Sequence, residues 1–239
     1  MRKTSIIFVF AGLVVGTFGL SASTINFDFT SGNGSGNGSG RVFTDPTSGL
    51  TITATAWSLL NYGSTFSTAQ LGQYSTGLGV CNSNEGNGCG SPDHQVDNVG
   101  SYDFILFQFS APVTIQSITI DPFAPPSADR DVTYYESDKS NPIPLNLTTV
   151  SGLSGFGFGP AVNQSNSAGL SPLPITIDDG PYRAILFGAS TTGADSDDYF
   201  KIASMTVDYK QVPEPATFWF LAGAFLTLEI FRRRFRKCA

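Results

Sequence analysis

Acidic side chains in loops are the residues of this chain whose type and grouping could do chemistry. Two such loops, residues 81–98 and 195–198, each precede an apolar run, and a third carries Asp129 and Asp131. Carboxylate and carbonyl oxygens on loops are the ligands of Ca²⁺, which takes six to eight of them. If the fold brings the first two loops together, calcium could bind at Glu85, Asp93, Asp97, Asp195, Asp197 and Asp198.

The same carboxylates also suit solvated loops, in which Asp and Asn side chains bond to nearby backbone N–H groups. No segment has the spacing of an EF-hand calcium loop. The sequence leaves both interpretations open, and it indicates no other cofactor.

Two cysteines lie close together, with seven residues between Cys81 and Cys89. Outside the cytoplasm such a pair is expected to oxidise to a disulfide. Closing so short a loop would contribute ~2–3 kcal/mol. A zinc site is not expected, because two cysteines and a single histidine do not make a complete ligand set.

Catalytic groups are scarce in this sequence. His94 is the only histidine, and no Gly-x-Ser-x-Gly elbow is present, so a Ser–His–Asp hydrolase is not indicated. We expect His94 to form hydrogen bonds within its loop. A glycosidase that uses two carboxylates stays open in principle, although the only glutamates outside the two ends of the chain are Glu85 and Glu136. We expect a protein that is not an enzyme.

Short apolar or alternating runs between Gly, Pro, Asn and Ser clusters predict β-strands throughout the middle of the chain. This pattern predicts an all-β fold, an antiparallel β-sandwich of the jelly-roll type. Tyr102–Phe109 is apolar on both faces and should be a central strand. A change of parity at Gln116-Ser117 predicts a β-bulge or a strand that changes sheets. The predicted strands are 25–29, 50–59, 102–109, 113–120, 132–135, 145–149, 173–177, 183–188 and 200–209, and the Gly-rich run 32–40 is predicted to be a loop.

The two ends of the chain carry targeting signals. Residues 1–23 have a basic start, an apolar stretch and a small-residue exit at Ser21-Ala22-Ser23, as in a secretory signal peptide. An uncleaved membrane anchor is the alternative. In residues 212–239, the motif Pro213-Glu214-Pro215 follows Val212 and leads into an apolar segment, which predicts a transmembrane helix. That helix includes Ala216, Phe218, Trp219, Leu221, Phe225 and Leu228, and it is followed by the basic residues Arg232, Arg233, Arg234, Arg236 and Lys237.

The net charge of −6 is an average over unlike segments. Residues 24–212 hold 6 basic and 17 acidic residues, a net charge of −11. Because a domain with this negative charge repels phosphate groups, we expect no nucleic-acid partner. The basic cluster at the end of the chain should stay in the cytoplasm, which puts the acidic ectodomain, residues 24–211, outside the inner membrane.

The order of Pro213-Glu214-Pro215, apolar helix and Arg-rich end resembles the PEP-CTERM sorting signal of bacterial proteins that an exosortase processes. The resemblance implies cleavage near the motif, so that helix and basic tail are lost. An ordinary membrane anchor is the alternative. Gly77-Leu78-Gly79-Val80, the cysteine loop and the strand that follows resemble, less specifically, ectodomains of exosortase-dependent surface proteins.

Together these features predict an exported, non-catalytic protein of the cell surface or extracellular matrix. It would be held in the inner membrane before processing, with an exosortase as its processing partner. The alternative is a carbohydrate-binding sandwich that acts on the cell's own exopolysaccharide, for which exposed rings of Trp57, Tyr62 and Tyr74 would form a stacking platform.

Overall fold

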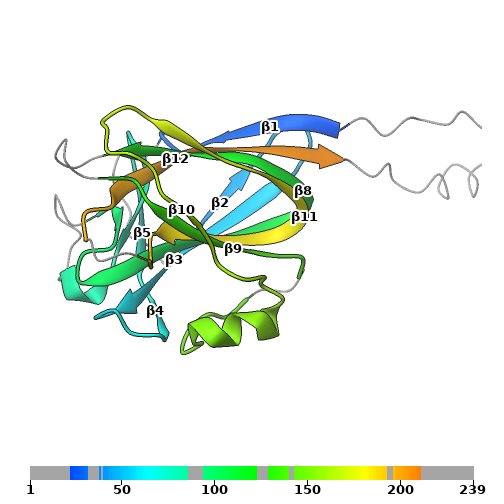
Figure 1. Ribbon diagram of the computed structural model, residues 1–239. Helices are drawn as coiled ribbons and strands as arrows, with labels where there is room; N and C mark the ends of the chain where they lie inside the picture. The colour runs from blue at the N-terminus through cyan, green and yellow to red at the C-terminus, as the bar shows by residue number, and fades with distance from the viewer. Residues whose placement is uncertain are drawn as a thin grey trace, which may run out of the picture. The chain divides into compact units, whose positions relative to one another are not determined.

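The computed structural model describes residues 22–31, 38, 40–85, 94–122, 129–139, 143–192 and 196–210, and these form an all-β unit, Ala22–Lys210 (Figure 1). All strand pairs within this part are antiparallel and join into one sheet. The strands are β1 (Ala22–Asp28), β2 (Gly40–Thr44), β3 (Thr51–Leu60), β4 (Phe66–Thr68), β5 (Gln70–Tyr74), β6 (Gly77–Cys81), β7 (Val96–Asp97), β8 (Ser101–Pro122), β9 (Val132–Ser137), β10 (Val162–Gln164), β11 (Leu173–Ala189) and β12 (Tyr199–Lys210). Two short 3-10 helices are η1 (Ser83–Glu85) and η2 (Val150–Phe156).

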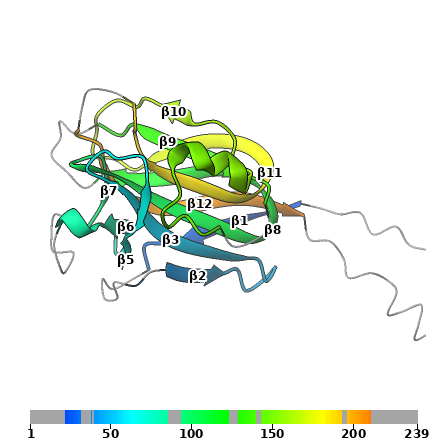
Figure 2. The same cartoon turned by 90° about the horizontal axis from the view of Figure 1, so that it is seen from below.

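The long strands β8 and β11 belong to both halves of the sheet. The first half of β8 pairs with β3, its second half pairs with β12, and β11 runs beside both halves. Ile105 and Phe107 from the first half of β8 share one buried cluster with Ile118 and Val207 from the region of the second. The sheet therefore closes over its own core in a sandwich-like arrangement (Figures 1 and 2).

The predicted strands 102–109 and 113–120 are two parts of β8, and the predicted bulge between them is confirmed. Ser117 pairs with Thr206 and Ile115 pairs with Val207, so Gln116 is an extra residue in β8. The extra residue changes the parity, which is why apolar residues on both sides of it enter the same core.

The first part of β8 is buried on both faces, as its apolar run predicts. Ile105 and Phe107 face the main core, whereas Phe104 and Leu106 face a second cluster. That second cluster includes Leu153 of η2, and Figure 2 shows this helical segment in front of β9 and β11.

The predicted strand 145–149 is wrong. This segment is a turn that leads into η2, in which Leu147 has a φ of 63° and is 76% exposed. Pro144, just before this segment, has no backbone N–H to donate to a neighbouring strand. Thr149 instead caps η2 by accepting a hydrogen bond from the backbone N–H of Gly152 (3.1 Å).

Some glycine-rich segments form strands that were not predicted from the sequence. All five residues of β6 are buried, including Gly77 and Gly79. A Cβ atom at Gly79 would lie 2.0 Å from the carbonyl oxygen of His94, so glycine permits a close approach of two chain segments. The predicted loop 32–40 is also shorter than expected, because Gly40 begins β2; residues 32–37 and 39 lie outside the described residues.

Strands β1 and β12 bring the two ends of the unit together. Ala22 pairs with Lys210, and the start of β1 lies beside the end of β12 (Figure 1). The other end of β12 is about 36 Å away at the rise of an extended strand, and there Tyr199 pairs with Asp97 of β7. The acidic loops therefore lie at the end of the sheet opposite Ala22 and Lys210.

Candidate functional site

Two of the acidic loops meet through a pair of reciprocal hydrogen bonds. Asn98 donates from Nδ2 to Oδ2 of Asp198 (2.7 Å), and the backbone N–H of Asp198 donates to Oδ1 of Asn98 (3.1 Å). The pairing of β7 with the start of β12 holds this contact in place. The predicted six-residue calcium site is nevertheless divided, because Glu85 and Asp97 belong to one cluster of carboxylates and Asp198 to another.

The first group, here called the Asp103 cluster, consists of Glu85, Asp97 and Asp103. One carboxylate oxygen from each residue lies within 4.8 Å of the others. Three separate elements supply them, since Glu85 ends η1, Asp97 ends β7 and Asp103 lies near the start of β8. Asp103 was absent from the predicted ligands, although an acid inside an otherwise apolar strand was the signal that could have found it.

Asp103 is the most confined member of this cluster. Its side chain is fully buried, and Oδ1 accepts a hydrogen bond from Nδ2 of Asn82 (3.1 Å). The Asn82 amide is oriented by its own oxygen, which accepts from the backbone N–H of Asn84 (2.9 Å). Oδ2 of Asp103 has no hydrogen-bond partner among the described residues.

Burial raises the pKa of Asp103 well above its usual value, and the negative charges of Asp97 and Glu85 raise it further. Asn82 and the Ser58 hydroxyl act in the opposite direction. Ser58 lies opposite Asp103 in the pairing of β3 with β8, but its hydroxyl forms no hydrogen bond of normal geometry. Ser58 is therefore a close polar neighbour of Asp103.

The second group, here called the Asp198 cluster, consists of Asp129, Asp131 and Asp198. Asp198 is fully buried and accepts hydrogen bonds at both oxygens, from the backbone N–H groups of Asp131 (2.7 Å) and Ser190 (3.3 Å) as well as from Asn98. Burial, with Asp129 as a second cause, raises the pKa of Asp198 to about 9. These three donors give both oxygens of the buried carboxyl group a hydrogen-bond partner.

The remaining predicted site residues lie either apart from the two clusters or outside the described residues. Asp197 is half-buried and belongs to neither cluster of the described carboxylates. Asp93, Asp195 and Cys89 lie outside the described residues, so the Cys81–Cys89 disulfide stays a prediction. Cys81 is buried at the end of β6.

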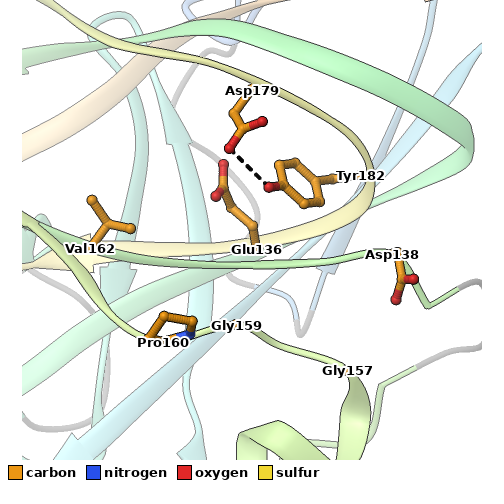
Figure 3. A pocket seen from close by; sticks show the side chains of 8 residues that line it. All are labelled: Glu136, Asp138, Gly157, Gly159, Pro160, Val162, Asp179 and Tyr182. Atoms are coloured by element: carbon orange, nitrogen blue, oxygen red, sulfur yellow. Dashed lines mark hydrogen bonds between the residues drawn. The ribbon is translucent and has the colours of Figure 1, made fainter.

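A pocket of about 500 Å³ lies between β9, the segment that follows η2, and the bend of β11 (Figure 3). Three of its residues point toward one another, Glu136 of β9 and Asp179 and Tyr182 of β11. The Tyr182 hydroxyl donates to Oδ2 of Asp179 (3.0 Å), and Oε1 of Glu136 is buried with no hydrogen-bond partner among the described residues. The other lining residues are Asp138, Gly157, Gly159, Pro160 and Val162.

The pKa of Glu136 is raised to about 7, chiefly by burial and then by the charge of Asp179. The pKa of Tyr182 is raised to about 12, again chiefly by burial. The sequence drew attention to Glu136 only as a rare glutamate. Its partner could not be predicted, because Asp179 is 43 residues away in the chain and reaches Glu136 only through the pairing of β9 with β11.

The predicted platform of three exposed rings does not form. Trp57 is buried, and Tyr74 is enclosed between His94, with ring centres 4.3 Å apart, and the Lys201 ammonium, 5.0 Å from the ring centre. Burial lowers the pKa of Lys201 to about 8. Of the three rings only Tyr62 is largely exposed, and it packs edge-on against Tyr102.

The predicted sorting motif Pro213-Glu214-Pro215, the apolar segment and the basic residues after it all lie outside the described residues, as do residues 1–21 of the predicted signal peptide. In the part of the chain that the structure describes, no helix has the length and apolar character needed to cross a membrane. Comparisons with protein-family models, with curated proteins and with solved structures return no match for this chain.

Proposed function

We propose that this chain is an exported, non-catalytic protein of the bacterial cell surface or extracellular matrix, sorted by an exosortase and built on a jelly-roll-like sandwich. The observation that carries the proposal is the order of Pro213-Glu214-Pro215, an apolar segment and five basic residues. The motif begins three residues after Lys210, the last residue of β12, so it follows the folded unit directly.

The arrangement of the ends supports this proposal. Because Ala22 pairs with Lys210, both predicted targeting segments adjoin the same end of the unit. The net charge of −11 over residues 24–212 suits a soluble ectodomain in this setting.

The test is the mass of the mature protein from its native host, for the natural chain and for a variant in which Pro213-Glu214-Pro215 is replaced by three alanines. We expect the natural chain to lose the residues that follow the motif and the variant to keep them. Pro172→Ala, an exposed proline outside the motif, is the matched control and should be processed normally. A natural protein that keeps its tail, or a variant cut at the same place, would contradict the proposal.

Carbohydrate binding is the second candidate function, and the pocket around Glu136, Asp179 and Tyr182 is the observation in its favour. Two carboxylates and a phenol are suited to hydrogen bonding with sugar hydroxyls, in a concave site of the size that small ligands fill. This pocket replaces the aromatic platform as the proposed binding surface.

Affinity electrophoresis in the host's exopolysaccharide tests this second candidate. Retardation of the natural protein should be reduced in Glu136→Gln and in Tyr182→Phe but kept in the exposed control Asp178→Asn. Equal mobility of all four proteins with and without polysaccharide would rule it out. The polysaccharide should also keep its chain length, because shortening would mean that the paired carboxylates catalyse hydrolysis.

A further inference from the structure

We infer that Glu85, Asp97 and Asp103 form a Ca²⁺ site at the end of the sheet opposite Ala22 and Lys210. Their carboxylate oxygens lie within 4.8 Å of one another. Oxygen ligands 2.3–2.6 Å from a common ion are separated by at most about 5 Å, so an ion of this size fits between the three groups.

The unsatisfied oxygen of Asp103 distinguishes this cluster from an ordinary group of acidic side chains. Its side chain is fully buried, yet Oδ2 accepts no hydrogen bond from any described residue. Ser58, its neighbour across the β3–β8 pair, is also fully buried and has an oxygen without a hydrogen bond. Buried polar groups are normally satisfied, and leaving them unsatisfied costs about 1–3 kcal/mol each. A cation bound at this cluster would supply the missing interaction to the Asp103 carboxylate.

The Asp198 cluster does not carry the same inference. Both oxygens of Asp198 already accept N–H donors, from Asn98, Asp131 and Ser190. The donors of Asp198 therefore account for both of its buried oxygens. Oδ1 of Asp129 in the same cluster is also without a hydrogen-bond partner among the described residues, but Asp129 is only half-buried, so water can reach its side chain. The contrast between Asp198 and Asp103 selects one of two acidic clusters that the sequence could not distinguish.

The chemistry of the Asp103 cluster favours calcium over other metals. All three side chains are carboxylates, and hard cations take oxygen ligands, whereas zinc prefers nitrogen and sulfur. The ligands come from a 3-10 turn and two strands rather than from one rigid cage, and Ca²⁺ tolerates irregular geometry better than Mg²⁺ does. Water molecules would complete the coordination.

A bound ion would join η1, β7 and β8 at one point. Glu85 is already connected to the end of β6, because its Oε2 accepts a hydrogen bond from the backbone N–H of Asn82 (2.7 Å). The ion would therefore add a second connection to the hydrogen bond that already joins Asn82, beside η1, to Asp103 of β8. This site does not depend on the proposed sorting of the chain, and its failure would leave that proposal untouched.

The test uses the purified full chain, freed of metal with EDTA and then dialysed. Titration calorimetry should show one Ca²⁺ bound per chain, and calcium at about 100 times its dissociation constant should raise the melting temperature by about 5 °C or more. Glu85→Gln and Asp103→Asn should weaken binding at least about tenfold. The control Asp178→Asn, an exposed acid whose φ of 48° asparagine also adopts, should bind as the natural chain does.

Glu85→Gln keeps the test decisive if Asp103→Asn fails to fold, since Glu85 is only half-buried. No binding heat and no melting shift at millimolar calcium would overturn the inference, as would unchanged affinity in Glu85→Gln. An equal melting shift with Mg²⁺ would overturn the choice of calcium.

Discussion

Asp103 and Asp198 are both fully buried at the same end of the sheet, but their surroundings differ. Asp198 accepts three hydrogen bonds that connect β12 to the segments before β8, before β9 and after β11. Asp103 has one donor and two acidic neighbours. The first residue is therefore part of the framework, whereas the second keeps one oxygen without a hydrogen-bond partner among the described residues.

Asp198→Ala should lower the free energy of unfolding by about 3 kcal/mol or more. The substitution leaves the buried N–H donors of Asn98 and Ser190 without an acceptor, and each unsatisfied donor costs about 1–3 kcal/mol. Urea unfolding measures the change. Asp138→Ala, at an exposed acid, is the control and should stay within about 0.5 kcal/mol of the natural chain. A small effect at Asp198 would show that water replaces its carboxylate.

Glu136 should make the protein less stable as pH rises through a defined range. Its folded pKa of about 7 exceeds the ordinary value of 4.5, so the folded state holds the proton more tightly than the unfolded state does. The contribution of Glu136 to the free energy of unfolding is therefore greatest below about pH 4.5, and this contribution is lost as pH rises through about 7. Asp179 and Tyr182 face the same carboxyl group.

Urea midpoints between pH 4 and 8 should fall more steeply for the natural chain than for Glu136→Gln, which cannot ionise. Asp178→Asn should keep the natural slope. Identical profiles for the natural chain and Glu136→Gln would mean that Glu136 titrates as it does in solvent.

At the scale of the elements, close approach between strands explains the glycines of β6. Gly77 has a φ of 126°, and a Cβ atom there would lie 2.3 Å from the carbonyl oxygen of Ile202. Gly79 approaches the carbonyl oxygen of His94 in the same way. The glycines therefore let β6 fit between β12 and the segment that leads to Asp97, a member of the Asp103 cluster.

Gly79→Ala should destabilise the protein by about 1–3 kcal/mol, the usual cost of overpacking a site enclosed by backbone. Gly155→Ala is the matched control, because a Cβ atom at Gly155 meets nothing within 4 Å. Thermal unfolding compares the two variants. Equal melting temperatures would mean that the segment at His94 moves aside at no cost.

At the scale of the whole molecule, the pairing of β1 with β12 limits where the signal peptide can be removed. Ile25 and Phe27 of β1 are buried in the main core, whereas Ala22, Ser23 and Thr24 are exposed. A cut within the core-forming part of β1 would remove apolar surface from that core and leave β12 with an open edge.

The mature N-terminus should therefore lie at or before Ile25, which agrees with the predicted exit at Ser21-Ala22-Ser23. N-terminal sequencing of the secreted protein measures it directly. A mature chain that begins after Phe27 would contradict the contribution of β1 to the fold.

The all-β class, the central position of Tyr102–Phe109 and the bulge at Gln116 could all be predicted from the sequence. Each depends on a local pattern, because the alternation of side chains along a strand records which faces are buried. The glycine-rich strands could not be predicted, since glycine has no side chain to record burial and β6 is defined by what approaches it.

The sequence by itself determined that acidic residues gather in loops beside the strands and that targeting signals are expected at both ends. Only the tertiary structure decided which acids meet. It joined Glu85 and Asp97 to Asp103 through separate elements, gave Asp198 its own donors, and placed Glu136 beside Asp179. The physical reason is that strand pairing connects residues far apart in the chain, so that register, and not spacing along the chain, determines which charges share a site.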